Sequence, residues 1–279
     1  MKLSKLMYIA CFALTASPVF AAELTVNCNA DYPTIQAAVN AANPYDTITV
    51  CPGTYDESVL IQTEGLTIRS TEISDRGPNT IVRRFAIGFA PNSGPHSVTI
   101  KGFSVTGSNV CIESSGDYNT IAFNNVYSCN LGIRVNAGNV GNNVHHNHVM
   151  NTSSGGITIE GYGGCCGSAG PGMNHNVHQN MVYNAGGEGC FYIWASNTEV
   201  HQNQASGTCG NGGINAIGSS GLHIHHNEIC ADIALFNATN ADVHHNELTG
   251  RITNENSDDN LKKNKEELST CPVPAPTPG

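Results

Sequence analysis

Positive charge is scarce in this chain. Its 279 residues include 12 Lys and Arg against 22 Asp and Glu, which gives a formal net charge of −10 at pH 7. Between residues 102 and 250, Arg134 is the only Lys or Arg. Because proteins that bind nucleic acids need a basic face to neutralise phosphates, we expect no nucleic-acid partner.

Long apolar runs are lacking after the N-terminus. Two early lysines precede an apolar run from Leu6 to Phe20, and Ala21 is small enough to suit a cleavage site. Residues 1–21 are therefore typical of a secretory signal peptide, and no later segment is apolar enough for a transmembrane helix. We expect a monomer that is secreted or exported to the periplasm.

Paired CxxC motifs are missing as well, although the chain has 11 cysteines. Without such pairs, a cysteine-ligated zinc site is disfavoured. Cleavage of the signal would remove Cys11, and the even number that remains in an exported chain predicts disulfide bonds.

One short phrase recurs along the chain: an apolar residue, two residues that are often histidines, and an asparagine. Its copies end at Asn124, Asn147, Asn180, Asn203, Asn227, Asn246 and Asn264. The spacing clusters near 22 residues, which is too short for two helices per repeat and suits one turn of a parallel β-helix. Asn suits tight corners, so we interpret these residues as a ladder of stacked amides with a structural role.

A second phrase alternates apolar residues with others, as in Ile133-Arg134-Val135 and Ile157-Thr158-Ile159. Alternation with period two predicts strands with one buried face, and the Gly, Asn and Ser between them predict turns. Stacked turns would bury one continuous apolar column. We therefore expect a single domain over residues 22–270 and an extended Pro-rich tail over residues 271–279.

Across residues 95–265 these repeats resemble the right-handed parallel β-helix proteins of the pectin-lyase-like superfamily. Residues 31–39 and 46–55 resemble the cap helix and first turn of that superfamily. Pro33 suits a helix start, and Ile35 and Val39 form an apolar pair one turn apart. The resemblance implies an all-β fold with an N-terminal capping α-helix. It does not fix an activity, because the fold hosts lyases, hydrolases, epimerases, adhesins and metal-binding proteins.

The length of one turn suggests which cysteines pair. Cys28 and Cys51 lie 23 residues apart, so they can join adjacent turns. The same argument suggests the pairs Cys209–Cys230 and Cys111–Cys129. Neighbouring Cys165 and Cys166 are not expected to pair with each other, and Cys190 and Cys271 have no evident partner in the sequence.

The first candidate site is the outward face of the strands in the second phrase. We expect one outward column to hold Cys111, Arg134, Thr158 and Tyr192, and the next to hold Glu113, Asn136, Glu160 and Trp194. Rungs about 4.8 Å apart would separate Glu113 and Glu160 by roughly 9–10 Å, near the upper end of the range for an inverting glycosidase pair. This pattern suggests Glu113, Arg134 and Glu160 as catalytic residues and Asn136, Tyr192 and Trp194 as substrate-binding residues for a polysaccharide.

Other features bear on that hypothesis. The segment 161–172 lengthens one turn, and long loops on solenoids often carry binding function. However, one arginine is few for a polyuronate lyase. The paired-Asp and Arg-x-Lys motifs of polygalacturonases are missing, as is the Asp-Pro-His-Glu motif of alginate epimerases. The activity, whether hydrolase, lyase or none, stays open.

The second candidate site is a histidine column on five successive turns, formed by His145, His178, His201, His225 and His244. Neutral imidazoles on adjacent rungs suit copper or zinc, and the fold is shared by periplasmic copper-binding proteins that assist nitrous oxide reductase maturation. The alternatives are a stacked polar ladder without metal and a pH sensor. Three function classes follow: carbohydrate binding or cleavage, which we favour, metal binding, and a structural or adhesive solenoid.

Overall fold

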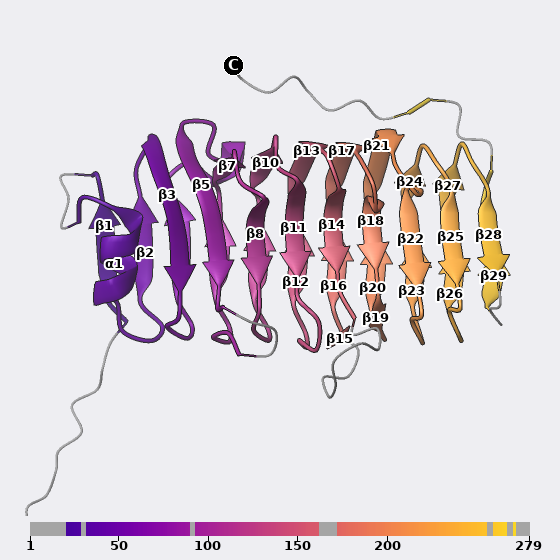
Figure 1. Ribbon diagram of the computed structural model, residues 1–279, viewed down its shortest axis with the longest axis horizontal. Coiled ribbons are helices and arrows are strands. Elements are labelled where there is room, and N and C mark those ends of the chain that lie inside the picture. The colour runs from indigo at the N-terminus through magenta and orange to yellow at the C-terminus, as the bar shows by residue number, and fades with distance from the viewer. Residues whose placement is uncertain are drawn as a thin grey trace, which may run out of the picture.

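The computed structural model describes residues 21–28, 32–89, 93–161, 172–255, 259–266 and 270–271. Within these residues the chain forms an elongated parallel β-solenoid with one short α-helix (Figure 1). This confirms the all-β class and the predicted repeat. No helix in the described ranges is long and apolar enough to cross a membrane. Most of the predicted signal peptide, the cysteines at 165 and 166, and the tail from 272 lie outside the described residues.

One wall of the solenoid is an eleven-stranded sheet, as far as the chain is described. Its strands, in order, are β1 (Glu23–Val26), β2 (Thr47–Val50), β4 (Thr67–Ser70), β6 (Thr99–Lys101), β9 (Thr120–Ala122), β12 (Asn143–His145), β16 (Asn176–His178), β20 (Glu199–His201), β23 (His223–His225), β26 (Asp242–His244) and β29 (Asn260–Lys262). We name it the histidine sheet, because its later strands end in the histidine column.

The other walls belong to a sheet that forks. It begins with the long strands β3 (Gly53–Ile61) and β5 (Thr80–Ile87). The first half of β5 pairs with β7, where Val82 faces Val105, and the second half pairs with β8, where Phe85 faces Ile112. From this point each turn carries two short strands in place of one long strand.

Two arms leave the fork. The β7 arm consists of β7 (Ser104–Thr106), β10 (Asn125–Tyr127), β13 (His148–Thr152), β17 (Met181–Ala185), β21 (Gln204–Cys209), β24 (Glu228–Ile229) and β27 (Glu247–Leu248). The β8 arm consists of β8 (Val110–Ser114), β11 (Leu131–Val135), β14 (Gly155–Ile159), β18 (Gly189–Ile193), β22 (Ile214–Ile217), β25 (Ile233–Phe236) and β28 (Ile252–Glu255). Figure 1 shows the β8 arm as a row of strands side by side along the long axis. The small strands β15 (Gly172–Met173) and β19 (Ala195–Ser196) pair separately.

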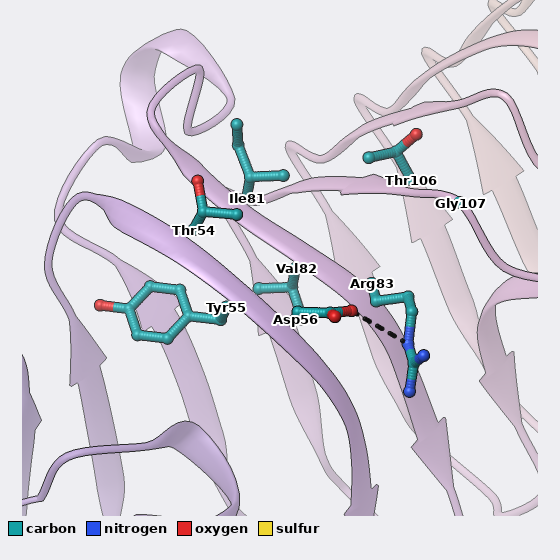
Figure 2. Close-up of a pocket in the computed structure, with 8 residues that line it drawn as sticks. All are labelled: Thr54, Tyr55, Asp56, Ile81, Val82, Arg83, Thr106 and Gly107. Carbon is teal, nitrogen blue, oxygen red and sulfur yellow. Dashed lines mark ion pairs between the residues drawn. The ribbon is translucent and has the colours of Figure 1, made fainter.

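An open pocket of about 260 Å³ lies at the fork, between β3, β5 and the end of β7 (Figure 2). Thr54, Ile81, Val82 and Thr106 are among its lining residues. Arg83 and Asp56 lie on its rim in an ion pair of 3.5 Å. The pocket holds none of the site residues predicted from the sequence.

Apolar side chains stack along the interior in columns. Ile112, Ile133, Ile157, Phe191 and Ile214 lie opposite one another on successive strands of the β8 arm, and all are fully buried. Burial of a side chain of this size contributes about 1.5–3 kcal/mol. The column is continuous, so each turn depends on its neighbours for a complete core.

The asparagine ladder is confirmed. Asn147 Nδ2 donates to Asn180 Oδ1 at 3.0 Å, Asn180 Nδ2 donates to Asn203 Oδ1 at 3.0 Å, and all three residues are buried. Each Nδ2 also donates to a carbonyl oxygen of another turn, such as Val144 O for Asn180. The left-handed backbone, however, lies one residue before the Asn: Gln179 has φ of 54° and His146 has φ of 55°. The Asn side chains therefore brace the corners, and the residues before them make the turn.

The helix α1 (Ile35–Ala41) forms near its predicted position. Thr34 caps it by accepting from Ala37 N at 3.1 Å, and Ile35 and Val39 are buried as the apolar pair predicts. The Glu57 carboxylate of β3 accepts from Ile35 N at 3.0 Å, which places a negative charge at the helix N-terminus, where the helix dipole favours it.

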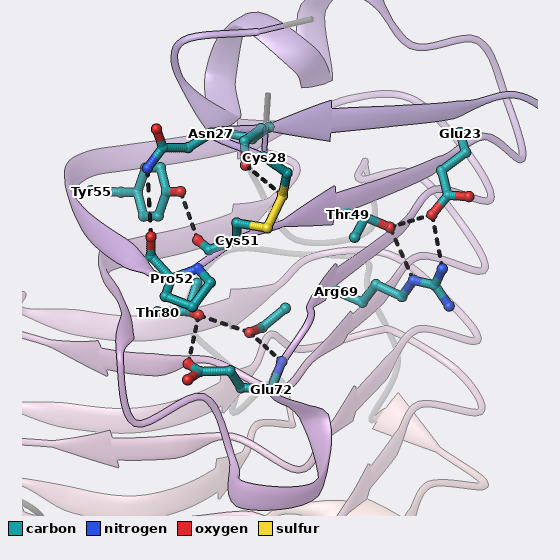
Figure 3. Close-up of a disulfide and its surroundings, with 12 residues drawn as sticks. Glu23, Asn27, Cys28, Thr49, Cys51, Pro52, Tyr55, Arg69, Glu72 and Thr80 are labelled. Atoms are coloured by element: carbon teal, nitrogen blue, oxygen red, sulfur yellow. Dashed lines mark hydrogen bonds and ion pairs between the residues drawn. A yellow bond between two sulfur atoms is a disulfide. The ribbon is translucent and has the colours of Figure 1, made fainter. Parts of the chain in front are cut away.

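Among the described residues, four disulfides join neighbouring parts of the solenoid: Cys28–Cys51, Cys111–Cys129, Cys190–Cys209 and Cys230–Cys271. The first two were predicted. In the first turn, Tyr55 Oη donates to Cys51 O at 2.8 Å beside the Cys28–Cys51 bond (Figure 3). These bonds fit an oxidising compartment outside the cytosol.

The predicted pair Cys209–Cys230 is wrong. Cys209 ends β21 and bonds to Cys190 at the start of β18, so this disulfide joins the two arms rather than consecutive rungs of one wall. Cys230 instead bonds to Cys271, which is 41 residues away near the end of the described chain. Turn length alone could not distinguish these arrangements, because several cysteines lie about one turn apart.

Candidate functional site

The outward face of the β8 arm carries two columns of side chains. In the first, Glu113, Arg134, Thr158, Tyr192 and Asn215 lie opposite one another on successive strands. This differs from the predicted column, which contained Cys111. Ile112 faces Ile133, and this register moves Glu113 into line with Arg134. Cys111 is instead fully buried and bonded to Cys129.

The second column lies two residues further along each strand. Asn136, Glu160 and Trp194 follow the aligned residues Val135, Ile159 and Ile193, as the sequence predicted. Beyond Trp194 the column continues with the paired residues Ile217 and Phe236. Phe236 is 42% exposed, so an apolar stripe runs over three successive rungs. The sequence analysis missed Ile217 and Phe236, although the alternation Ile233-Ala234-Leu235-Phe236 carries the signal for an outward Phe.

The charged residues of this face form two ion pairs on neighbouring strands, which we name the charged network. Arg134 Nη2 contacts Glu160 Oε2 at 2.7 Å, and Arg84 forms an ion pair with Glu113. Asn136 Nδ2 donates to Glu113 Oε1 at 2.9 Å, and Asn136 itself is buried. The three residues predicted to be catalytic therefore lie on one face. Both carboxylates already accept hydrogen bonds, and a substrate must displace these contacts before either oxygen can accept a hydrogen bond from it in their place.

Tyr192 lies beside the acidic residues Glu188 and Glu160. Burial raises the pKa of the Tyr192 hydroxyl, and the charges of Glu188 and then Glu160 raise it further. The hydroxyl therefore stays protonated and can act as a hydrogen-bond donor. Glu188 also accepts from Thr158 Oγ1 at 3.0 Å. The sequence analysis missed Glu188, which lies in the turn just before β18.

Trp194 is partly exposed beside two glycines. A Cβ atom at Gly161 would lie 2.2 Å from Trp194 O and 2.9 Å from Trp194 Cγ, and a Cβ at Gly218 would lie 3.1 Å from Trp194 Nε1. Only glycine lets the backbone at Gly161 approach Trp194 this closely.

The face is hollowed at its N-terminal end. An open cavity of about 360 Å³ lies where the two columns reach the small residues Ala86 and Gly88. Arg84 and Phe89 line it, and Phe89 is 72% exposed. Aromatic side chains thus stand at both ends of the charged network.

The histidine sheet presents a different surface. The five predicted histidines form one column in which successive rings stack: the centroids of His145 and His178 are 4.9 Å apart with an 8° interplanar angle, and those of His225 and His244 are 5.1 Å apart at 3°. The rings between them stack in the same way. The predicted outward column is therefore observed.

A second imidazole follows the first on three of these turns. His146, His226 and His245 occupy the left-handed corner position, and Gln179 and Gln202 occupy it on the turns between. In each pair the two Nδ1 atoms face each other, at 2.8 Å for His145 and His146. The sequence analysis could not orient these corner residues, because the position of the turn was unknown.

Burial, together with the neighbours His178 and His146, lowers the pKa of His145 to about 4. Arg76 lies nearby, where its Nε donates to His146 O at 3.2 Å. Among the described residues, no three His, Cys, Asp or Glu side chains converge as ready metal ligands. In the structure as it stands, the column is a stacked ladder of imidazoles.

Known proteins share the fold at low sequence identity. A PL6 alginate lyase in complex with a trisaccharide superposes with a TM-score of 0.61 and 14% identity over 83% of this chain. The PL6-family alginate lyase AlyGC gives 0.56 and 12% over 81%, and ORF18 of Geobacillus virus E2 gives 0.54 and 10% over 82%. These likenesses confirm the expected resemblance to right-handed β-helix proteins, and at such identities they bear on the fold alone.

The matches cover only part of the longer proteins. The chain spans 56% of the trisaccharide-bound lyase, 57% of the viral protein and 38% of AlyGC. No family of protein sequences matches the chain, and no curated protein matches it by sequence.

Proposed function

We propose that this protein binds a carbohydrate polymer along the outward face of the β8 arm. The observation that carries the proposal is the adjacency of Tyr192 and Trp194 to the Arg134–Glu160 ion pair on rigid strands. Aromatic faces pack against the apolar faces of sugar rings, and fixed carboxylate and guanidinium groups hydrogen-bond sugar hydroxyls. Binding by an alginate lyase of the same fold to a trisaccharide gives this use of the fold a precedent.

The charge of the face favours a neutral glycan over a polyuronate. Glu113, Glu160 and Glu188 contribute three carboxylates, and both arginines of the network are already paired. A polyuronate would meet repulsion from these groups and find no free cation among them. The function we propose is therefore binding, and cleavage would require the Arg134–Glu160 pair to open.

A glycan array followed by titration calorimetry tests this proposal. Replacement of Trp194 by Ala should weaken binding of a neutral oligosaccharide about tenfold or more, because it removes the stacking surface. Glu160→Gln should weaken it less, since the shape is kept. Tyr45→Ala is the matched control, because Tyr45 is 64% exposed in the first turn, and it should leave affinity unchanged.

Two outcomes contradict the proposal. If no glycan binds the wild type, the face has no carbohydrate site, and the structural or adhesive solenoid becomes the better reading. If Tyr45→Ala and Trp194→Ala weaken binding equally, the site lies elsewhere.

Several accompanying features belong to the same proposal. Residues 1–21 act as the export signal, and the mature protein is a monomeric domain over residues 22–270 with a Pro-rich tail. The helix α1 covers the first turn of the solenoid, a role that the burial of Ile35 and Val39 supports.

A further inference from the structure

The histidine column is the middle of a longer column of basic side chains. In the same outward register of the histidine sheet, Arg69 lies opposite Lys101 at one end, and His244 lies opposite Lys262 at the other. Over the nine described strands from β4 to β29, only Ala122 interrupts the series. With rungs about 4.8 Å apart, the column extends about 38 Å along the solenoid. We name it the basic track, and its members are Arg69, Lys101, His145, His178, His201, His225, His244 and Lys262.

The charge of the basic track is fixed at its ends and depends on pH in its middle. Arg69 is paired with Glu23 at 2.9 Å (Figure 3), whereas Lys101 and Lys262 form no ion pair within the part of the chain that the structure describes. Between these ends the basic members are all imidazoles. Arg134, the only Lys or Arg between residues 102 and 250, lies on the β8 arm. Because the unperturbed pKa of imidazole is about 6.5, the middle of the track is mostly neutral at pH 7.5 and gains positive charge in mild acid.

Few carboxylates oppose that charge. Glu199 Oε1 lies 3.0 Å from His225 Nε2, and Asp242 Oδ2 lies 3.9 Å from His244 Nε2. Burial lowers the pKa of His201 and of His244, and the charges of Glu199 and Asp242, respectively, offset part of this lowering. The other titratable groups that face the imidazoles are basic, namely Arg76, His146, His223, His226 and His245. The imidazoles therefore outnumber the carboxylates that could neutralise them.

A column of neutral polar side chains lies beside the N-terminal half of the track. Thr67, Thr99 and Thr120 lie opposite one another, and Asn143 and Asn176 continue the series. These residues stand two positions before the members of the track, so they lie on the same outward face. Hydroxyl and amide groups can both donate and accept hydrogen bonds, which suits the hydroxyls of a sugar chain.

We propose that the basic track binds a linear carboxylated polysaccharide with coupled uptake of protons. One sugar ring lengthens an extended chain by about the same distance as one rung, so a polymer with one carboxylate per ring can place one charge at each basic side chain. A polymer of denser charge fits less well, because duplex DNA carries one charge per about 1.7 Å of its axis. The net charge of −10 on the whole chain also opposes such a polymer.

Stacking couples the ligand to protons. The ring centroids of His178 and His201 are 4.9 Å apart, and two protonated imidazoles at this distance repel each other. A carboxylate laid across them offsets that repulsion and favours the protonated form. By linkage, lowering the pH then strengthens binding, by about tenfold per pH unit for each proton taken up.

Three variants separate the track from net charge. The track variant is His178→Gln with His201→Gln, which removes two imidazoles from the middle of the column. The control variant is His96→Gln with Arg251→Gln, which removes two basic groups outside the track. The fixed-charge variant is His178→Lys with His201→Lys. All three should keep the wild-type circular dichroism spectrum, because outward polar substitutions are usually mild.

Titration calorimetry of the full chain with a β-1,4-linked oligoglucuronate tests the proposal, with the cello-oligosaccharide of equal length as the same sugar chain without carboxylates. We expect the wild type to bind oligoglucuronate at least tenfold more tightly at pH 5.5 than at pH 7.5. Titrations in two buffers of different ionisation enthalpy should show net proton uptake. At pH 5.5 the track variant should bind at least tenfold more weakly and the control variant within threefold of the wild type. The fixed-charge variant should bind at least tenfold more tightly than the wild type at pH 7.5.

Three results would overturn the proposal: an affinity that does not rise in acid, the same pH dependence for the cello-oligosaccharide, or equal losses in the track and control variants. Tighter binding of duplex DNA than of oligoglucuronate at pH 5.5 would also overturn it. The basic track lies on a different wall from Trp194, so Trp194→Ala should leave oligoglucuronate binding within threefold of the wild type. The proposal can therefore fail while the neutral-glycan site of the β8 arm stands, and the reverse also holds.

Discussion

The histidine sheet and the β8 arm both stack their strands as successive rungs, but they carry different kinds of outward side-chain column. On the histidine sheet, one residue type repeats, so each imidazole packs on an identical neighbour. On the β8 arm, the residues that lie opposite one another are a Glu, an Arg, a Thr and a Tyr. A column of identical residues packs on itself. A mixed column instead presents groups of different chemistry to a ligand.

The largest effect should come from the ladder that supports both surfaces. In Asn180→Ala, the buried backbone N–H of Asn147 loses its Oδ1 acceptor and Val144 O loses a donor, whereas Asn147 Nδ2 still donates to Ile121 O and Asn203 Oδ1 still accepts from the backbone N–H of residue 180. Each unsatisfied buried group costs about 1–3 kcal/mol, so we expect the loss at these two groups to lower the free energy of unfolding by about 2–6 kcal/mol. Guanidinium denaturation measures it. A loss below 1 kcal/mol would mean that the ladder is not what braces the corners.

Acid should weaken the histidine side of the molecule selectively. Burial lowers the pKa of His175 to about 4, so between pH 6.5 and 4 the unfolded chain binds a proton that the folded chain does not. Stability is therefore fully present above pH 6.5 and declines by roughly 3 kcal/mol toward pH 4 from this residue alone. His175→Asn should flatten the pH dependence of the melting temperature. An equally steep dependence in that variant would assign the acid sensitivity to other groups.

The apolar stripe of the β8 arm should make a smaller contribution, visible in binding and not in stability. Phe236→Ala removes a side chain that is 42% exposed, so we expect the affinity for a long neutral oligosaccharide to fall about threefold to tenfold. A short oligosaccharide that reaches only Trp194 should bind the variant as well as the wild type. Equal effects on long and short ligands would limit the site to Tyr192 and Trp194.

The smallest effect should come from a single change within the histidine column. His178→Gln on the outward face should change the free energy of unfolding by no more than about 0.5 kcal/mol, because partly exposed polar substitutions are usually mild. Thermal melts beside Asn180→Ala make the contrast direct. A loss comparable to that of the Asn variant would show that stacked imidazoles, and not amides, hold this wall.

The sequence predicted the repetitive features well and the irregular ones poorly. The Asn ladder and the histidine column follow from a phrase that repeats on successive turns. The repeat itself therefore determines which of these residues lie opposite one another. The strand β8 carries the first rung of its arm, and its register to β11 depends on a corner that no repeat marks. This is why Glu113 was assigned to the wrong column and Cys111 to the surface.

Irregular contacts between neighbouring turns also could not be predicted from the sequence. The Arg84–Glu113 pair joins β5 to β8 across the fork, where one long strand gives way to two short ones. The disulfide Cys190–Cys209 joins the β8 arm of one turn to the β7 arm of the next turn. Both depend on where the chain bends, and the turn residues of a solenoid show that bends exist without fixing their angles.

The asparagine ladder also makes the solenoid tolerant of inserted sequence. The bond between Asn147 and Asn180 spans 33 residues and the bond between Asn246 and Asn264 spans 18, yet the two bonds are 3.0 and 2.9 Å long. The coil therefore keeps its pitch while the length of the peptide between two corners varies almost twofold. A foreign loop grafted between β14 and β15, where the longest of these segments already lies, should leave the rungs above and below in place. The protein can thus serve as a display scaffold whose geometry is set by the corners and whose specificity is set by what is inserted between them.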